Sequence, residues 1–362
     1  MVRSIIYGYI VQQGLKKRIK PSVIQLPVTG RCNSRCVTCN IWKQAEKKDI
    51  DTKALKKALG DPFFSKVHMV GVNGGEPSLL RDLEGLLDAL CVLKHLKKVY
   101  IITNGLLTDR LMQMMERIRK ECLKQRVRVF LTVSVDGIDG IHDTIRGIPD
   151  AFEKTMATLK KVMPQKERYC DHLEVGCTVS RWNVACLNEI DVYMQQLNIP
   201  VNYHLAVPVR RLHNFEEPSF SVMNDERSRL LAADFFYGQF KFGKDIKHKL
   251  RCFLIWKYLV DNGEKRYAAC NYLRGDVTIT ENLDLYLCAT ASEKVGNLGE
   301  ESASQLYKNH RFQPVEEKVT TYCHQCAHYM FFPTVKGFLL FMAESVNPLR
   351  WLFYRWKALW LK

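Results

Sequence analysis

The sequence predicts an α/β fold built on a parallel sheet. Short apolar runs of strand length alternate with longer amphipathic runs of helical length between residues 23 and 207. Such alternation indicates parallel strands joined by right-handed helical crossovers. Polar and glycine-rich motifs follow several of these strands, and ligands of parallel sheets bind at the carboxyl ends of the strands. With 362 residues, 47% of them apolar, the chain is long enough for one large domain and a smaller one.

The expected elements follow one another with short connections. Strands are expected at residues 23–28, 67–72, 99–102, 127–135, 173–179 and 201–207. Helices are expected between them at residues 51–60, 82–96, 109–123, 152–163 and 187–197. A basic amphipathic helix is expected over residues 1–22. Residues 216–265 are charged and rich in aromatic residues, so we expect a helical bridge there.

The first predicted strand leads into a loop with three closely spaced cysteines, Cys32, Cys36 and Cys39. Thiolates bind soft metals, and a four-iron cluster normally takes four cysteine ligands. The next cysteine is Cys91, so a cluster held by this loop keeps one iron open for a non-protein ligand. The alternatives are a disulfide framework, which needs an oxidising compartment, and a zinc knuckle, which usually shows paired C-x2-C motifs.

A second motif, Gly74-Gly75-Glu76-Pro77, follows the second predicted strand. Consecutive glycines let a ligand approach the backbone closely, and Glu76 places an anion beside them. Two further strands end in polar groups: Asn104 follows one, and Ser134 and Asp136 follow the other. These positions all fall at strand carboxyl ends, where one ligand could contact them together.

The cysteine loop and the motifs after it resemble the radical S-adenosylmethionine (radical SAM) enzymes. The resemblance implies a partial (β/α)6 TIM-like barrel over residues 23–215. It implies that Cys32, Cys36 and Cys39 hold a [4Fe–4S] cluster whose open iron binds S-adenosylmethionine (SAM). The implied SAM-contacting residues are Gly74, Gly75, Glu76, Pro77, Asn104, Ser134, Asp136 and Arg146. Thr38 stands where the family usually has an aromatic residue near the adenine, and Trp42 could take that role.

Four more cysteines follow the barrel: Cys270, Cys288, Cys323 and Cys326. Cys270 and Cys288 flank a probable hairpin, and four soft ligands suffice for a cluster or a zinc site. This layout resembles the SPASM/twitch branch of the family, which implies a small α+β domain at residues 266–330 with one auxiliary [4Fe–4S] cluster. Leu283 replaces a glycine common in that branch, and we expect Asn282 to adopt the left-handed conformation instead.

The net charge of the chain and the composition of its last residues indicate which partners it could bind. There are 54 Lys and Arg residues against 38 Asp and Glu, a net charge of +16, which favours anionic partners. Residues 331–362 form an apolar and basic tail, and Leu, Phe and Trp opposed by Arg and Lys are typical of a helix at a membrane surface. Packing on the barrel or on a second copy is the alternative. No secretory signal or membrane-spanning stretch is evident, so a cytoplasmic protein, peripheral on the inner face of the membrane, is expected.

By resemblance, the expected function is an oxidoreductase or related radical enzyme. SAM is cleaved reductively to a 5′-deoxyadenosyl radical, which abstracts hydrogen from a substrate. The charge and the tail favour a phosphorylated or lipid-linked sugar or polyol, with flavodoxin or ferredoxin as reductant. A peptide- or protein-modifying maturase is the alternative. An iron–sulfur electron carrier or RNA-binding protein would leave Gly74–Pro77 and Ser134–Arg146 without a purpose, so nucleic acid is not expected. No catalytic acid or base is assigned.

Overall fold

A computed structural model of the chain describes residues 19–212, 214–215, 218–243, 245–273 and 275–346. Most of the predicted helix at residues 1–22 therefore lies outside the described residues. The same holds for residues 347–362 of the predicted tail.

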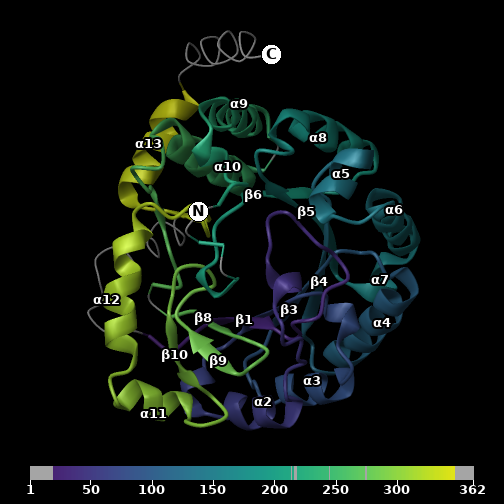
Figure 1. Ribbon diagram of the computed structural model, residues 1–362, viewed down its shortest axis with the longest axis vertical. Helices are drawn as coiled ribbons and strands as arrows, with labels where there is room; N and C mark the ends of the chain where they lie inside the picture. The colour runs from purple at the N-terminus through teal and green to yellow at the C-terminus, as the bar shows by residue number, and fades with distance from the viewer. Residues whose placement is uncertain (1–18, 213, 216–217, 244, 274, 347–362) are drawn as a thin grey trace.

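Six parallel strands form the body of the molecule and pair in chain order, as predicted. They are β1 (Val23–Pro27), β2 (Met69–Asn73), β3 (Lys98–Thr103), β4 (Arg128–Ser134), β5 (His172–Val179) and β6 (Val201–Leu205). The strands curve into a partial barrel, and the helices between them cover its outer face (Figure 1). This confirms the α/β class and the partial TIM-like barrel.

The covering helices are α2 (Thr52–Leu59), α3 (Leu83–Leu90), α4 (Thr108–Lys124), α5 (Asp139–Arg146), α6 (Ala151–Val162), α7 (Lys166–Tyr169) and α8 (Leu187–Gln196). Helix α3 is shorter than the predicted 82–96, because the chain turns after Leu90. Short 3-10 turns are η1 (Ile41–Lys43), η2 (Pro62–Phe64), η3 (Pro77–Leu79), η4 (Met163–Gln165), η5 (Val184–Cys186), η6 (Arg210–Leu212) and η7 (Val222–Asn224).

The predicted helical bridge consists of two long helices, α9 (Glu226–Phe242) and α10 (Ile246–Val260), packed against each other. Their contact is largely aromatic: the rings of Phe240 and Phe253 lie 5.3 Å apart, and Tyr237 packs on Trp256 at 4.8 Å. Trp256 is only 1% exposed. The bridge therefore has a core of its own, continuous with that of the barrel.

The C-terminal part extends the barrel sheet, which the sequence did not predict. Strand β8 (Val277–Ile279) pairs in parallel with β1, and β9 (Asp284–Tyr286) and β10 (Lys294–Asn297) continue the sheet beyond it. Within the described residues this sheet has nine strands. The two-residue strands β7 (Ala268–Ala269) and β11 (Phe332–Pro333) form a second, small sheet.

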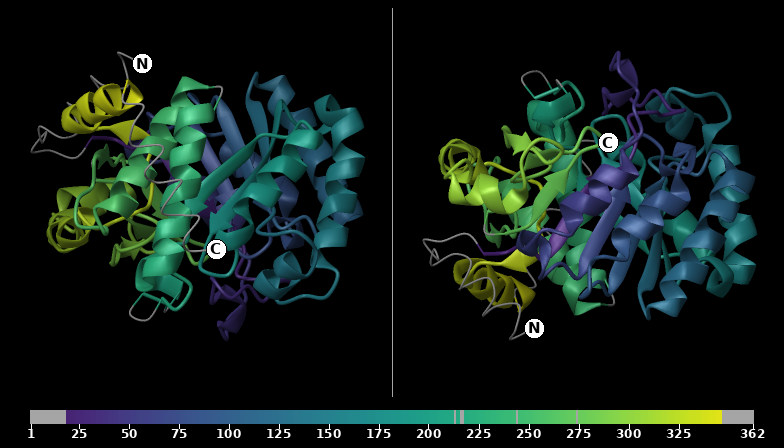
Figure 2. Two further views of the ribbon diagram at one scale, coloured as in Figure 1. Left: turned by 90° about the horizontal axis from the view of Figure 1, so that it is seen from above. Right: turned by 90° about the horizontal axis from the view of Figure 1, so that it is seen from below.

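Three helices complete this part: α11 (Ala303–Lys308), α12 (Phe312–Cys323) and α13 (Val335–Ser345). Both views of Figure 2 show the green and yellow C-terminal third on one side of the barrel and the helices of the first half on the opposite side. Among the described residues, no helix has the length and apolar content needed to cross a bilayer.

The strands present alternate side chains to two environments. On β5, Leu173, Val175 and Val179 are buried on one face, whereas Glu174 and Thr178 on the other face are only half-buried. Because side chains alternate along a strand, the second set points away from the covering helices and into the barrel interior. On β6 the same alternation turns Asn202 and His204 inward.

Candidate functional site

The cysteine loop follows β1 and is held by backbone bonds to two neighbouring segments. Glu76 N–H donates to the Arg31 carbonyl at 2.8 Å. On the other side, Arg35 N–H donates to the Arg146 carbonyl at 2.8 Å, and Val37 N–H donates to the Ile145 carbonyl at 3.0 Å. The loop is therefore fixed between the end of β2 and the end of α5, at the carboxyl edge of the sheet.

The three predicted cluster ligands lie together in this loop as free, half-buried thiols. Burial, with a smaller contribution from neighbouring Cys36 and Glu76, raises the pKa of Cys32 to about 12. Burial also raises the pKa of Cys39. Thiols with raised pKa values, such as Cys32 and Cys39, become thiolates only beside a strong positive centre, which is what a bound metal cluster provides. All 13 cysteines of the chain are free, so the disulfide alternative finds no support.

The glycine pair of the second motif is explained by the path of the cysteine loop. Gly74 has a φ of +131°, which disfavours other residues. A Cβ at Gly75 would come within 1.9 Å of the Arg31 carbonyl oxygen. Glycine at these positions therefore allows the cysteine loop to lie directly against the end of β2.

Glu76 is almost fully buried and bonded within the protein, which the sequence did not indicate. Its carboxylate accepts from Ser78 N–H at 3.1 Å, the Thr103 hydroxyl at 2.7 Å and Asn104 N–H at 2.8 Å. Pro77 directly follows and begins η3. Glu76 thus joins the ends of β2 and β3, and the backbone around Gly74 and Gly75 remains the part of this motif that a ligand could approach.

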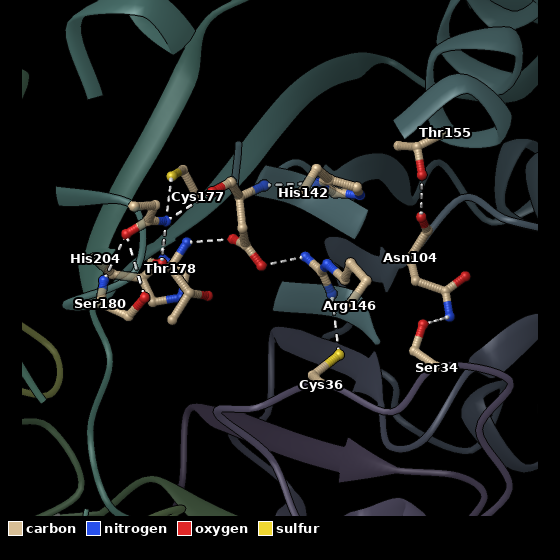
Figure 3. A network of polar contacts seen from close by, with 12 residues as sticks. Ser34, Cys36, Asn104, His142, Arg146, Thr155, Cys177, Thr178, Ser180 and His204 are labelled. Carbon is tan, nitrogen blue, oxygen red and sulfur yellow. Dashed lines mark hydrogen bonds and ion pairs between the residues drawn. The ribbon is translucent and has the colours of Figure 1, made fainter. Parts of the chain in front are cut away.

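Asn104 supports the cysteine loop from the end of β3. Its side-chain amide donates to Asn33 Oδ1 at 2.7 Å and to the Ser34 hydroxyl at 3.1 Å. Thr155 of α6 donates to its carbonyl at 2.9 Å. Figure 3 shows Asn104 between Thr155 and Ser34. This residue positions the loop that carries the thiols.

An ion pair between Asp136 and Arg146 lies beside the cysteine loop. Their closest N–O distance is 2.7 Å, and Arg146 Nη1 also lies 3.8 Å from Cys36 Sγ (Figure 3). Burial opposes the charge of Arg146, but the Asp136 carboxylate and Cys36 raise its pKa. Its Nε is buried and has no partner within the described residues. This donor fits the carboxylate of a bound ligand.

His142 and Thr178 hold Asp136 in place. Asp136 N–H donates to His142 Nδ1 at 3.0 Å, and Thr178 N–H donates to Asp136 Oδ1 at 2.7 Å. Burial, together with the charge of Arg146, lowers the pKa of His142 to about 2, so this histidine is neutral. Ser134, at the end of β4, is half-buried two residues before Asp136.

Thr38 and Trp42, the two residues considered for the adenine contact, lie at and just after the C-terminal end of the cysteine loop. The Thr38 carbonyl accepts a 3.2 Å bond from Asn214. Trp42 Nε1 donates to the Cys36 carbonyl at 3.3 Å, so its ring lies next to the cluster loop. The structure thus places an aromatic residue against the cysteine loop, and the adenine contact expected of Trp42 stays a prediction.

The site fits the cofactors that the sequence implied. Cys32, Cys36 and Cys39 offer three thiols, and the Arg146 Nε offers a buried donor for a ligand carboxylate. No three His, Cys, Asp or Glu side chains of the described residues are grouped closely enough to bind a single metal ion. In a four-iron cluster each iron takes one thiolate, so the sulfurs lie farther apart than around a single ion.

The second cysteine set lines one cavity, with about 430 Å³ of space not filled by atoms, part of it open to solvent. Cys270, Cys288, Cys323 and Cys326 all line it. They come from three separate segments, because Cys323 and Cys326 stand three residues apart in one of them, and the structure brings all four to this cavity. Burial raises the pKa of Cys270 to about 11 and that of Cys323 to about 12, so these thiols also need a positive centre to ionise.

Arg266 fastens the wall of this cavity and was missed by sequence reasoning. Its guanidinium donates to the carbonyls of Cys326, His328 (2.7 Å) and Tyr329 (2.9 Å), while Nε donates to Ala268 at 2.8 Å. The charge of Arg266 also lowers the pKa of Cys270, against the effect of burial. The prediction for Asn282 was wrong: Leu283 itself adopts the left-handed conformation, with a φ of +63°.

The barrel interior carries a set of polar side chains that the sequence did not single out. Glu174 accepts from Thr132 at 2.9 Å and from Asn202 at 3.5 Å. Asn202 in turn accepts from Arg251 of α10. These residues come from elements far apart in the chain, so no local motif could have revealed them.

The fold and the site together define the class of protein: a partial parallel barrel whose first loop carries three closely spaced free cysteines. Residues 26–166 match the family described as the Radical SAM superfamily. The chain therefore carries a radical SAM domain, and a [4Fe–4S] cluster and SAM are the cofactors of such a domain.

Curated relatives support the same domain. The chain is 29% identical over 197 residues to Fe-coproporphyrin III synthase of Methanosarcina barkeri, covering 52% of this chain and 45% of the relative. It is 30% identical over 197 residues to GTP 3′,8-cyclase of Clostridium botulinum, covering 52% and 55%. The chain thus spans about half the length of the curated relatives it matches.

Two solved structures share the fold over most of the chain. The structure of anSMEcpe with bound AdoMet and a peptide superposes with a TM-score of 0.60 at 17% identity, covering 92% of this chain and 97% of the other. Streptococcus suis SuiB bound to S-adenosylmethionine gives 0.57 at 14% identity, covering 88% and 72%. The likeness extends beyond the barrel, as expected from the resemblance to the SPASM/twitch branch.

Proposed function

We propose that this protein is a radical SAM enzyme that abstracts hydrogen from an anionic sugar or polyol. The observation that carries the first part is the cysteine loop, where three free thiols lie beside the buried Asp136–Arg146 pair. When bound there, the cluster with SAM supplies a 5′-deoxyadenosyl radical. The chain's own residues hold the thiols in place, offer the Arg146 Nε to a carboxylate and shield the site from water.

The barrel interior supports an anionic substrate. Arg251 enters it from α10, with its guanidinium 4.2 Å from the Phe331 ring centroid. Its Nε is buried without a partner within the described residues. Burial lowers the pKa of Arg251 to about 10, so the side chain remains charged at neutral pH. A buried guanidinium with an unused donor is suited to a phosphate or carboxylate.

His204 is near enough to Arg251 and to the Asp136–Arg146 pair for their charges to act on it. It shares a 3.1 Å hydrogen bond with the Thr178 hydroxyl, and Thr178 N–H is bonded to Asp136 (Figure 3). Burial, with Arg251, lowers the pKa of His204 to about 4, yet its side chain is accessible to solvent. A neutral, accessible imidazole inside the barrel can bind a substrate hydroxyl and accept a proton from it.

We further propose that Cys270, Cys288, Cys323 and Cys326 hold an auxiliary [4Fe–4S] cluster; structural zinc is the alternative, although it would need these thiols to lie closer together than they do among the described residues. We also propose flavodoxin or ferredoxin as the reductant and a location at the inner face of a membrane. The second candidate function is modification of a peptide. It is favoured by the likeness to anSMEcpe, which was solved with a peptide, although that likeness concerns the fold.

The test is anaerobic turnover of the reconstituted protein with isotope-labelled SAM and a chemical reductant. We expect 5′-deoxyadenosine, formed faster with a panel of sugar phosphates and nucleotide sugars than with cysteine- or serine-containing peptides. Arg251→Gln should weaken the stimulation by sugar phosphates roughly tenfold to hundredfold, because charged hydrogen bonds of about 1.5–3 kcal/mol are lost. Arg128→Gln, at an exposed position of β4, is the matched control. Stimulation by peptides alone would favour the second candidate.

A further inference from the structure

Helix α13 is apolar on two faces, and only one of them is packed against the protein. The inner face carries Phe341, which is 2% exposed and packs on the rings of Phe240 and Phe253. Glu344 also turns inward, where Tyr237 donates to its carboxylate at 3.0 Å. A surface helix normally presents polar residues on its opposite face.

The outer face of α13 instead carries a row of large apolar side chains. Val335 is 36% exposed, Leu339 63%, Met342 47%, and Val346, at the end of the helix, 80%. Their spacing of four, three and four residues places them on one side of the helix. Figure 1 shows α13 at the outer edge of the molecule, next to α9 and α10. We call these four residues the α13 stripe.

A further exposed ring lies close to the stripe. Lys241, near the end of α9, donates a 2.6 Å bond to the Glu344 carbonyl, so α9 ends beside the end of α13. Phe242 follows at once and is 69% exposed. Exposed apolar side chains gathered at one place mark an interaction surface, whereas single ones need no explanation.

The amino-acid sequence after the stripe is also rich in apolar and basic residues. Beyond Val346 and Pro348, the sequence of residues 347–362 contains further large apolar residues, among them Leu349, Phe353, Trp356 and Trp360. The basic residues of the segment 335–362 are Lys336, Arg350, Arg355, Lys357 and Lys362, and its single acidic residue is the inward-turned Glu344. Apolar and Trp residues interspersed with Lys and Arg favour the interface of an anionic bilayer.

We propose that the α13 stripe and residues 347–362 together form a surface that binds the face of an anionic lipid bilayer without crossing it. The positive charge of this segment favours a lipid bilayer over a second copy of the protein as the binding partner. Two copies of this segment would bring their basic residues together, whereas acidic headgroups neutralise them. Docking on the membrane would place the protein beside a lipid-linked substrate. The proposal rests on the membrane location in the proposed function and names the surface responsible for it, but it does not depend on the radical chemistry.

The test is flotation of the full-length protein with phosphatidylcholine vesicles, with and without phosphatidylglycerol. We expect binding to the mixed vesicles and little to phosphatidylcholine alone. Replacing Leu339, Met342 and Val346 together by Ser should lower the partition coefficient roughly hundredfold, because three large apolar side chains no longer enter the interface. Leu123→Ser with Val192→Ser, two side chains each 55% exposed elsewhere, is the matched control and should bind like the unmodified protein.

A second variant separates charge from apolar contact. Replacing Arg350, Arg355 and Lys357 together by Gln should lower binding to the mixed vesicles about hundredfold, since each basic residue near the surface contributes about fivefold. Brominated lipids should quench part of the tryptophan fluorescence of the bound protein. Equal flotation of the serine variant and the unmodified protein would overturn the proposal. So would a dimer in light scattering that the serine substitutions dissociate while vesicles stay unbound.

Discussion

At the level of single residues, Gly75 shows why the motif after β2 requires glycine. The position tolerates no side chain, because a Cβ there would meet the Arg31 carbonyl of the cysteine loop. We expect Gly75→Ala to displace the loop and to lower the iron bound at Cys32, Cys36 and Cys39 to a small fraction. Iron and sulfide determination after anaerobic reconstitution measures this.

Gly140 provides the control for that experiment. It lies in α5, and a Cβ there has open space around it. Gly140→Ala should keep full iron content and stabilise the protein by about 0.5–1 kcal/mol, since alanine favours a helix. Equal iron content in the two variants would contradict the close approach of the two loops.

His142 predicts a pH dependence of stability. Its pKa in the folded protein is about 2, against an ordinary value of 6.5, so the unfolded chain binds the additional proton below pH 6.5. The stabilising contribution is therefore complete above that pH and is lost as the pH falls. His142→Asn retains an acceptor for Asp136 N–H and should flatten the profile by about 1.5 kcal/mol between pH 6.5 and about pH 5. Urea unfolding at several pH values measures it, and parallel profiles would count against this role.

At the level of elements, the strands of the barrel were predictable because each is a short apolar run ended by polar or glycine-rich residues. Helix α5 was missed, since Gly, Asp, His and Thr in residues 139–146 are typical of a loop. The helix packs on the barrel through His142 and Ile145, both of which are buried, and this burial is a tertiary contact that the local sequence does not show. The cysteines were predictable from local spacing. The interior residues Glu174, Asn202 and Arg251 were not, because they meet only after the chain folds.

The four cysteines around the second cavity are expected to bind one cluster together. We expect about eight irons per chain in the reconstituted protein, as two four-iron clusters require. The double variant Cys288→Ser, Cys323→Ser should retain about four irons and still bind SAM. Four irons together with one zinc in the unmodified protein would establish the zinc alternative instead.

At the level of the whole molecule, the barrel and the C-terminal part share one sheet through the pairing of β1 with β8. Asp276 reinforces this connection: its carboxylate accepts from Val23 N–H at 3.0 Å and from the Ser22 hydroxyl at 2.9 Å. This contact spans 253 residues of sequence, so sequence patterns gave no sign of it. The two parts are therefore coupled, although the sequence suggested separate domains.

The coupling predicts a single unfolding transition for the metal-free protein. Asp276→Ala should lower the free energy of unfolding by about 3 kcal/mol, because several hydrogen bonds to a buried carboxylate are lost together. Scanning calorimetry measures this. Two separate heat-absorption peaks in the unmodified protein would show that the parts unfold independently.

The central claim is that Cys32, Cys36 and Cys39 hold a cluster with one iron open to SAM. Electron paramagnetic resonance of the reduced protein, with and without SAM, tests it most directly. We expect a [4Fe–4S]⁺ signal that changes when SAM is added, and its loss in the variant with all three cysteines replaced by Ala. Replacing the buried Cys122, Cys170 and Cys177 by Ser should preserve the SAM-sensitive signal. A SAM-sensitive signal that survives in the triple alanine variant, or a cluster signal that SAM leaves unchanged, would contradict the claim.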